Sequence, residues 1–239
     1  MNANVIGLLD NRGTIAVAGT AATLTLAAGT LNNSNLLTAT GDVGISGGAL
    51  TNAGITQSGA NLAITNSATT VVAGGRLEAI GALTVNSATV NSAGTIAAGG
   101  AVSVTGRSSL DLSGAVFSNA SSIALSSNGL ANIASRVDAK TNATVTAGQV
   151  QLSGDIVADG AVGVTATGGA LGIISNIDSG AGIMLRADNG DLTVGAVSEL
   201  FGVGGITADA RSIDVACNLI EPGAIALTAQ NGLIASGNL

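Results

Sequence analysis

The sequence has no tryptophan, tyrosine or histidine, and Phe117 and Phe201 are its only aromatic residues. A compact domain of 239 residues normally fills a thick core with larger rings, yet 46% of this chain is hydrophobic without them. The apolar residues are Ala, Val, Leu and Ile, and the polar ones are chiefly Gly, Ser, Thr and Asn. Such a mixture suits thin, regularly repeated layers better than one thick core. The composition therefore predicts a narrow, elongated body.

Charged residues are also scarce, at 9% of the chain, with seven basic against fourteen acidic side chains and a net charge of −7. Binding to nucleic acid or to an anionic membrane surface requires clustered Lys and Arg. The cations are instead spread along the chain, at Arg12, Arg76, Arg107, Arg136, Lys140, Arg186 and Arg211. We expect no nucleic-acid partner.

Cysteine occurs once, at Cys217, so a disulfide within the chain is excluded. In its apolar setting, and with no histidine as a base, Cys217 is interpreted as a small core residue. The first residues carry no positive charge followed by an apolar run, as a signal peptide would, and no stretch approaches about eighteen apolar residues. We expect no membrane insertion, and we favour an interior piece of a longer exported chain over a cytoplasmic protein.

Short apolar positions recur about every twenty residues in three interleaved series. The first series is Leu24/Leu26, Val43/Ile45, Leu62/Ile64, Leu83/Val85, Val102/Val104, Ile123/Leu125, Ala143/Val145, Val162/Val164 and Ile183/Leu185. The second is Leu31, Leu50, Val71, Val90, Leu110, Leu130, Val150, Leu171, Leu192 and Ile213. The third is Ile15, Leu36, Ile55, Leu77, Ile96, Val116, Val137, Ile156, Ile177, Val197 and Ile220. A fixed period of this length indicates a repeat architecture.

Each apolar pair has the two-residue alternation of a short strand with one buried face, and helical spacing is not sustained anywhere. Glycine-rich and Asn-Ser steps between the pairs favour turns. Stacking such coils at about 4.8 Å gives about twelve coils and a rod of roughly 55 Å. The sequence predicts an all-β fold, a parallel β-helix (β-solenoid) of triangular cross-section with three short strands per coil. We expect one domain over 1–239, with the clearest coils in 11–198, less regular ones in 199–239 and a loop near 199–205.

Asparagines gather at the expected corners, where identical side chains can stack and pair their amides along the axis. The alternative is that they are exposed turn residues. These positions are Asn32, Asn33, Asn52, Asn66, Asn86, Asn91, Asn119, Asn132 and Asn142.

Candidate chemistry is sparse. Asp155 with Asp159, and Asp188 with Asp191, are close enough in sequence to suggest an acid–base pair, but their Gly- and Asn-rich surroundings favour solvated turn residues. Asp111 and Asp214 are expected at equivalent outward positions five coils apart, about 25 Å, too far to share a substrate. Neither a calcium-binding nonapeptide, an EF-hand loop nor a phosphate loop is present. We therefore assign no catalytic, cofactor-binding or metal-ligating residue.

Four segments carry a family resemblance: NRGTIAVAG at 11–19, NAGITQSGANLAIT at 52–65, NSAGTIAAGGAVSV at 91–104 and SGDIVADGAVGVT at 153–165. They resemble the roughly twenty-residue haemagglutinin repeats of the filamentous haemagglutinin family, the exoproteins of two-partner secretion, and the similarity covers about 11–230. The resemblance implies a right-handed parallel β-helix that forms the shaft of a secreted or surface-held adhesin, haemolysin or contact-dependent inhibition protein of a Gram-negative bacterium. The family's N-terminal secretion domain and any terminal toxin domain are not matched, so no functional residues are carried over.

The resemblance further implies export through an outer-membrane secretion pore and contact with host-cell surfaces or glycans. We expect a monomeric rod that is not an enzyme. Two alternatives stay open. One is a β-helical polysaccharide lyase or hydrolase, which needs carboxylates gathered on adjacent coils. The other is a phage or surface spike segment, which would normally form a trimer.

Overall fold

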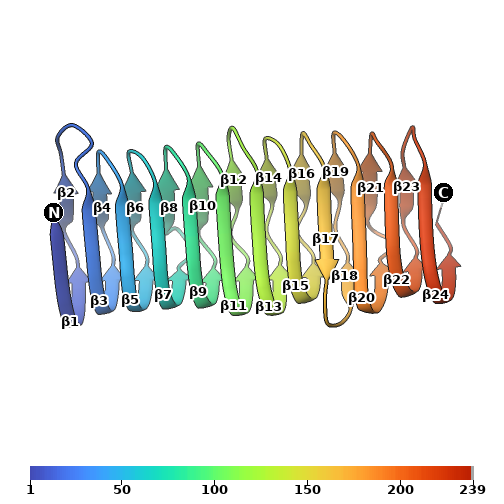
Figure 1. The fold of residues 1–239 in the computed structure, drawn as a ribbon, viewed down its shortest axis with the longest axis horizontal. Helices are drawn as coiled ribbons and strands as arrows, with labels where there is room; N and C mark the ends of the chain where they lie inside the picture. Colours follow the sequence, from blue (N-terminus) through green and yellow to red (C-terminus); the bar gives the residue numbers. More distant parts are fainter. Residues whose placement is uncertain (238–239) are drawn as a thin grey trace.

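The computed structural model describes residues 1–237 as strands stacked along a single axis (Figure 1). Equivalent strands of successive coils pair in parallel, forming a 13-stranded and an 11-stranded sheet. The chain makes about 12 turns of roughly 20 residues each. The predicted all-β parallel solenoid is therefore confirmed.

The 13-stranded sheet consists of β1 (Asn2–Asn11), β3 (Leu24–Asn33), β5 (Val43–Asn52), β7 (Leu62–Val71), β9 (Leu83–Ser92), β11 (Val102–Leu112), β13 (Ile123–Ile133), β15 (Ala143–Leu152), β17 (Val162–Ala166), β18 (Leu171–Ile173), β20 (Ile183–Val194), β22 (Ile206–Val215) and β24 (Ile225–Ala235). The 11-stranded sheet consists of β2 (Thr14–Val17), β4 (Leu36–Ala39), β6 (Ile55–Ser58), β8 (Arg76–Ala79), β10 (Thr95–Ala98), β12 (Val116–Ser118), β14 (Val137–Ala139), β16 (Ile156–Ala158), β19 (Ile177–Ser179), β21 (Glu199–Gly202) and β23 (Asn218–Ile220).

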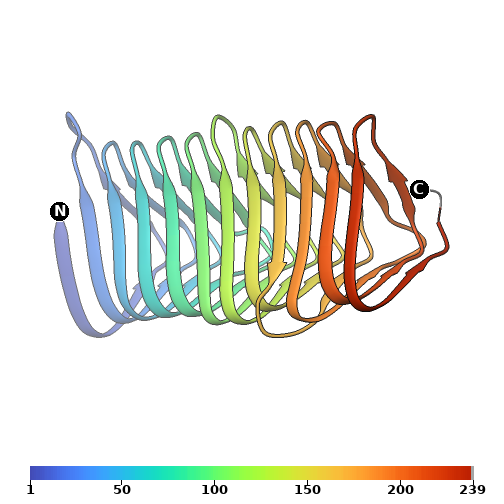
Figure 2. The same ribbon diagram turned by 45° about the vertical axis from the view of Figure 1, so that its right-hand side comes forward.

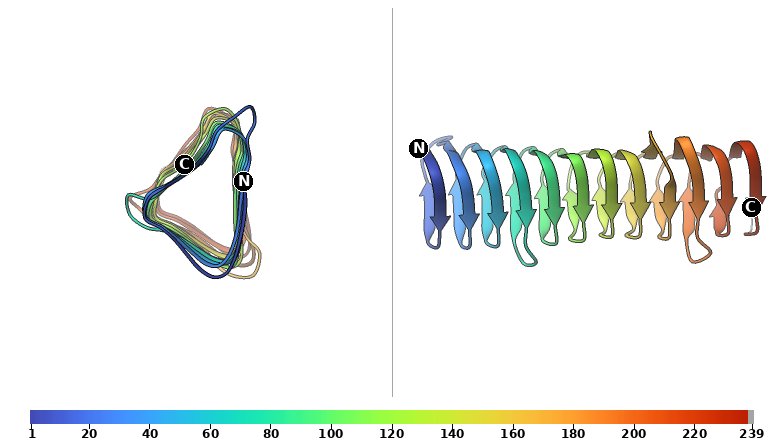
Figure 3. Two further views of the ribbon diagram at one scale, coloured as in Figure 1. Left: turned by 90° about the vertical axis from the view of Figure 1, so that its left-hand side faces the viewer. Right: turned by 90° about the horizontal axis from the view of Figure 1, so that it is seen from below.

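The end-on view shows a triangular section with three faces (Figure 3, left). Most long strands supply two of them by bending at a corner without leaving the sheet, which Figure 2 shows as a continuous curved ribbon. In β9, Leu83 and Val85 point inward on the first face, and Val90 points inward on the second. The short strands form the third face. Within 1–237, the first two faces are separate strands in one coil alone, where 167–170 lie between β17 and β18.

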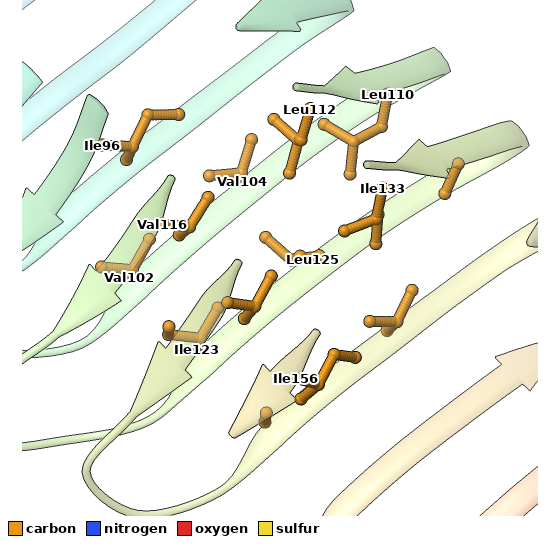
Figure 4. Close-up of a cluster of buried hydrophobic side chains, with 14 of the residues drawn as sticks. Ile96, Val102, Val104, Leu110, Leu112, Val116, Ile123, Leu125, Ile133 and Ile156 are labelled. Carbon is orange, nitrogen blue, oxygen red and sulfur yellow. The ribbon is translucent and has the colours of Figure 1, made fainter. Parts of the chain in front are cut away.

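The first predicted series lines the interior of the first face. Its members pair coil to coil from Leu24 through Ile183, and every one is buried. The same register continues to Ile206 and Ile225. Figure 4 shows Val102, Val104, Ile123 and Leu125 directed into the interior with residues of the other two faces. The interior is thus a continuous column of aliphatic side chains.

The second series is wrong at two positions. Leu50 pairs with Thr69, which pairs with Val90, so Thr69 takes the inward place that was assigned to Val71. Val71 is buried one inward position later along the strand. Ala131 replaces Leu130, which is 39% exposed.

The third series is wrong at Leu36, Ile55, Val197 and Ile220. The inward register runs instead through Leu37, Thr56, Leu200 and Leu219. At Ile55, a search for apolar residues passes over the inward Thr56 and selects its apolar neighbour. At Leu36 and Ile220, it selects the outward one of two adjacent apolar residues. Because side chains alternate in direction, an error of one residue moves the assignment to the outer face.

The irregular coil has its extra residues at 195–198, between β20 and β21, and not at the expected 199–205. There Ser198 N–H donates to the Gly195 carbonyl, and Val197 is 82% exposed. Ile183 consequently pairs with Ile206, 23 residues later. The N-terminal segment, which matches the period weakly, forms β1 and pairs with β3. The stack is continuous from β1 to β24.

A short amide ladder runs inside the corner after the second face. Asn11 Nδ2 donates to Asn33 Oδ1 at 2.7 Å, and Asn33 Nδ2 donates to Asn52 Oδ1 at 2.7 Å. All three residues are at most 5% exposed. In the next coil the same position is Val71. The predicted amide stacking is confirmed for Asn33 and Asn52.

The other asparagines differ from one another. Asn86, Asn91 and Asn119 are exposed, and Asn32 is half-buried. Asn142 Oδ1 accepts the Ala161 N–H, and Asn132 donates to the Asp111 carboxylate. Asn66 is buried, and its Nδ2 has no hydrogen-bond partner among the described residues. These seven support the exposed-turn interpretation only in part.

Candidate functional site

Both aromatic residues of the chain point outward on one axial row of the third face. The register along this row runs Ala97, Phe117, Asp138, Val157, Asp178 and Phe201. Phe117 lies between the inward Val116 and Ser118, so strand alternation directs its ring outward. Both rings are half-buried against the surface. The third face therefore holds the only aromatic surface of the molecule.

A hollow of about 200 Å³ lies beside Phe117, across β12, β14 and the end of β16. It is lined by Phe117, Ser118, Asn119, Asp138, Ala139, Lys140 and Asp159. A second hollow, of about 260 Å³, lies on the same face over β10, where Ala97 and Gly99 leave space. It is lined by Gln57, Ser58, Arg76, Glu78, Ala79, Ile80, Ala97, Ala98, Gly99 and Asn119. Asn119 borders both hollows.

Ion pairs neutralise the charges around the two hollows. Lys140 Nζ pairs with Asp159 on the next coil, and Arg136 pairs with Asp138 at 2.9 Å. Arg76 pairs with Glu78 beside the second hollow. Apart from Glu78, these side chains are at least 40% exposed, so each pair contributes little to stability.

The hydrogen bond from Lys140 to Asp159 raises the pKa of the ammonium group, as do the charges of Asp159 and Asp138. Lys140 therefore stays protonated and acts as a hydrogen-bond donor, not as a base. Together the hollow offers an aromatic surface, two carboxylates on adjacent coils, an ammonium group and a side-chain amide. Such a set can bind a polar ligand through hydrogen bonds and stacking.

The structure keeps Asp155 and Asp159 apart. They flank β16 four residues from each other, about 13 Å along an extended strand. Asp155 Oδ1 accepts the Asn176 N–H, whereas Asp159 faces Lys140. They do not form an acid–base pair.

Asp188 and Asp191 both lie in β20, where each binds a different arginine. Asp188 pairs with Arg186, and Asp191 pairs with Arg211 at 2.8 Å. The hydrogen bond from Arg211 is the main cause that lowers the pKa of Asp191. Both carboxylates are therefore held as ion-pair acceptors.

Asp111 and Asp214 occupy the same outward row, as predicted. The register between them runs Asp111, Asn132, Gln151, Gly172, Thr193 and Asp214. Five strand steps separate the two carboxylates, so they cannot contact a common small ligand.

The cluster of Asp138, Lys140 and Asp159 was not predicted from the sequence. Its signal was present in the spacing, because Lys140 and Asp159 are 19 residues apart, one coil. Inspection of close sequence neighbours overlooks such pairs, since residues that meet across the stack are about twenty positions apart.

The remaining candidates carry less chemistry. Cys217 is buried, and this burial raises the pKa of its thiol. Within 1–237, no three His, Cys, Asp or Glu side chains are grouped so that they could hold a metal ion. Three further hollows, of about 350 to 410 Å³, are lined by uncharged residues. In the same range, no helix has the length and apolar character needed to cross a membrane.

Comparison with known proteins gives no match to a family model, a curated protein or a solved structure.

Proposed function

We propose that this chain is the structural shaft of a secreted or surface-exposed bacterial exoprotein, which holds a binding or effector region away from the cell. The observation that carries the proposal is the uninterrupted stack from β1 to β24, in which two parallel sheets join every coil to the next. Backbone hydrogen bonds along the axis and a continuous aliphatic interior resist bending and proteolysis. The mechanism is mechanical.

The repeat resemblance supports the cellular setting. In this proposal the protein belongs with the filamentous haemagglutinin type of adhesin in a Gram-negative bacterium. It leaves the cell through an outer-membrane pore, by means of a secretion domain outside 1–239, and it contacts host-cell surfaces or glycans.

Surface labelling tests the location. An antibody raised against residues 1–239 is applied to intact cells of the organism that encodes the chain, before and after external protease. We expect labelling of intact cells, and its loss after a protease treatment that leaves a cytoplasmic marker protein undigested. Labelling that requires permeabilised cells would contradict the proposal.

Solution scattering with gel filtration tests the shape and oligomeric state. We expect a monomer of 22.6 kDa whose pair-distance distribution is that of a rod about 55 Å long. A trimeric mass would favour the spike alternative instead.

An enzyme acting on polysaccharide is the second candidate, because Asp138 and Asp159 lie on adjacent coils at one hollow. Incubation with a panel of polysaccharides, followed by assays for new reducing ends and for unsaturated uronic acids, tests it. The shaft proposal predicts no product. Product formation that is abolished in both Asp138→Asn and Asp159→Asn would replace it with the enzyme.

A further inference from the structure

The two hollows on the third face lie next to each other along the axis, and we call them together the axial groove. We propose that the axial groove binds a neutral, hydroxyl-rich glycan chain, with Phe117 as its stacking surface. The inference rests on the proposed function only in that glycan contact belongs to it, and it names the site and the ligand class.

The axial groove is long enough for an oligosaccharide. Its lining runs from Gln57 on β6 to Asp159 beyond β16, across five strand steps, or about 24 Å. Asn119 borders both hollows and joins them. Ile80, 71% exposed, forms part of the wall above the small residues Ala97 and Gly99. A single sugar would fill only part of this length.

Phe117 is the aromatic surface within the axial groove. The described core residues are aliphatic apart from Cys217, so the fold does not need this ring for packing. Its row neighbours are the small Ala97 and the shorter Asp138, so neither covers the ring face fully. The apolar face of a sugar ring can stack on such a surface, which loses little conformational entropy on binding.

The charges favour a neutral ligand. Three cations, Arg76, Arg136 and Lys140, are each paired with a carboxylate at the axial groove, so the local charge balances. A polyanionic glycan would be repelled by the carboxylates without a surplus of cations to bind it. A polycation would be repelled by the cations without a surplus of carboxylates. Sugar hydroxyls both donate and accept, which matches carboxylates, guanidinium groups, the ammonium group and the exposed Asn119 amide.

The test is a titration of the ¹⁵N-labelled chain with cellopentaose, maltopentaose, laminaripentaose and chitopentaose, with pentagalacturonate as the anionic probe. We expect at least one neutral probe to shift the amide signals of the axial groove, including the Asn119 side chain, and pentagalacturonate to bind more weakly. Absence of binding by all four neutral probes, tighter binding of the anion, or shifts confined to another face would overturn the inference.

The variants make the test specific. Phe117→Ala should weaken binding of the neutral probe about tenfold, as loss of a central aromatic contact does, and Phe117→Trp should restore it. Phe201→Ala is the matched control, because Phe201 lies on the same row but lines neither hollow. We expect its affinity to equal that of the unchanged chain. Equal affinity of Phe117→Ala and Phe201→Ala would overturn the inference.

Thermal melting of both alanine variants checks that each is folded, since both rings point outward. The outcome is separable from that of the proposed function. If no glycan binds, the expected rod shape and surface labelling are unaffected. If scattering or surface labelling contradicts the proposed function, the glycan titration is unaffected, because neither measurement involves a glycan.

Discussion

At the scale of single residues, direction in the strand decides whether a side chain contributes to the interior. Val104 is fully buried between Val85 and Leu125, whereas its neighbour Ser103 faces outward and is half-buried. The two residues share the same strand and the same ladder, so they separate the effect of burial from that of the backbone.

Val104→Asp should lower the free energy of unfolding by at least about 3 kcal/mol, because an unpaired carboxylate would be buried among aliphatic side chains. Ser103→Asp is the control and should change it by less than about 1 kcal/mol. Urea unfolding followed by circular dichroism measures both. Similar midpoints for the two variants would show that the faces are wrongly assigned.

The amide ladder makes a second prediction at this scale. Asn33→Val removes both ladder bonds, although Asn11 Nδ2 still donates to the Leu36 carbonyl and Asn52 Oδ1 still accepts from Thr56, and it should cost about 1 to 3 kcal/mol. Replacing Asn11, Asn33 and Asn52 together by Val also removes the bonds that Asn11 and Asn52 donate to backbone carbonyls of the next coil. We therefore expect the triple variant to be less stable than Asn33→Val. Urea midpoints in the opposite order would contradict the ladder's role.

At the scale of elements, the corners fix how closely successive coils approach. Gly114 precedes β12, at the corner between the second and third faces. A Cβ atom there would lie 1.9 Å from the carbonyl oxygen of Gly94 in the preceding coil. This corner has little space because the backbones of adjacent coils are in contact there.

Gly114→Ala should therefore destabilise the fold by about 1 to 3 kcal/mol through overpacking against backbone. Gly163→Ala is the matched control, since a Cβ at this outward position of β17 would have its nearest neighbour at 3.7 Å. It should be neutral or slightly stabilising, because glycine loses more chain entropy on folding than alanine. The thermal unfolding midpoints of the two variants, measured together, test this difference in stability. Equal midpoints would show that the corner relaxes to accommodate the added Cβ atom.

At the scale of the whole molecule, stability comes from neighbouring coils, because each coil contacts mainly the coils before and after it. Val102 pairs with Leu83 on one side and with Ile123 on the other. Deleting 102–122 therefore brings Ile123 into the place of Val102, where it meets Leu83 in the same register.

This one-coil deletion should fold, with a cooperative transition and a lower denaturant slope, since less surface is buried. Deleting 102–112 is the control, because it removes two of the three faces of the same coil and leaves the third. This deletion breaks the register of the following coils. We expect it to lose the cooperative transition or to aggregate. Equivalent unfolding curves for the two deletions would contradict a stack specified coil by coil.

The sequence by itself was sufficient to predict the β-solenoid architecture and the buried residues of the first face. Apolar pairs such as Leu83 and Val85 recur at one period, and alternation of side chains along a strand converts that period into a buried face. The equivalent positions of Asp111 and Asp214 followed from the same counting.

Only the tertiary structure decided which polar residues lie inside and which charges meet. Thr56 and Thr69 are buried because the coil register places them inward, although their side chains do not mark them as core. Loops such as 195–198 shift the count by two residues, so positions beyond them cannot be assigned from a fixed period. Asp159 meets Lys140 of the preceding coil, because stacking places residues about one coil apart side by side.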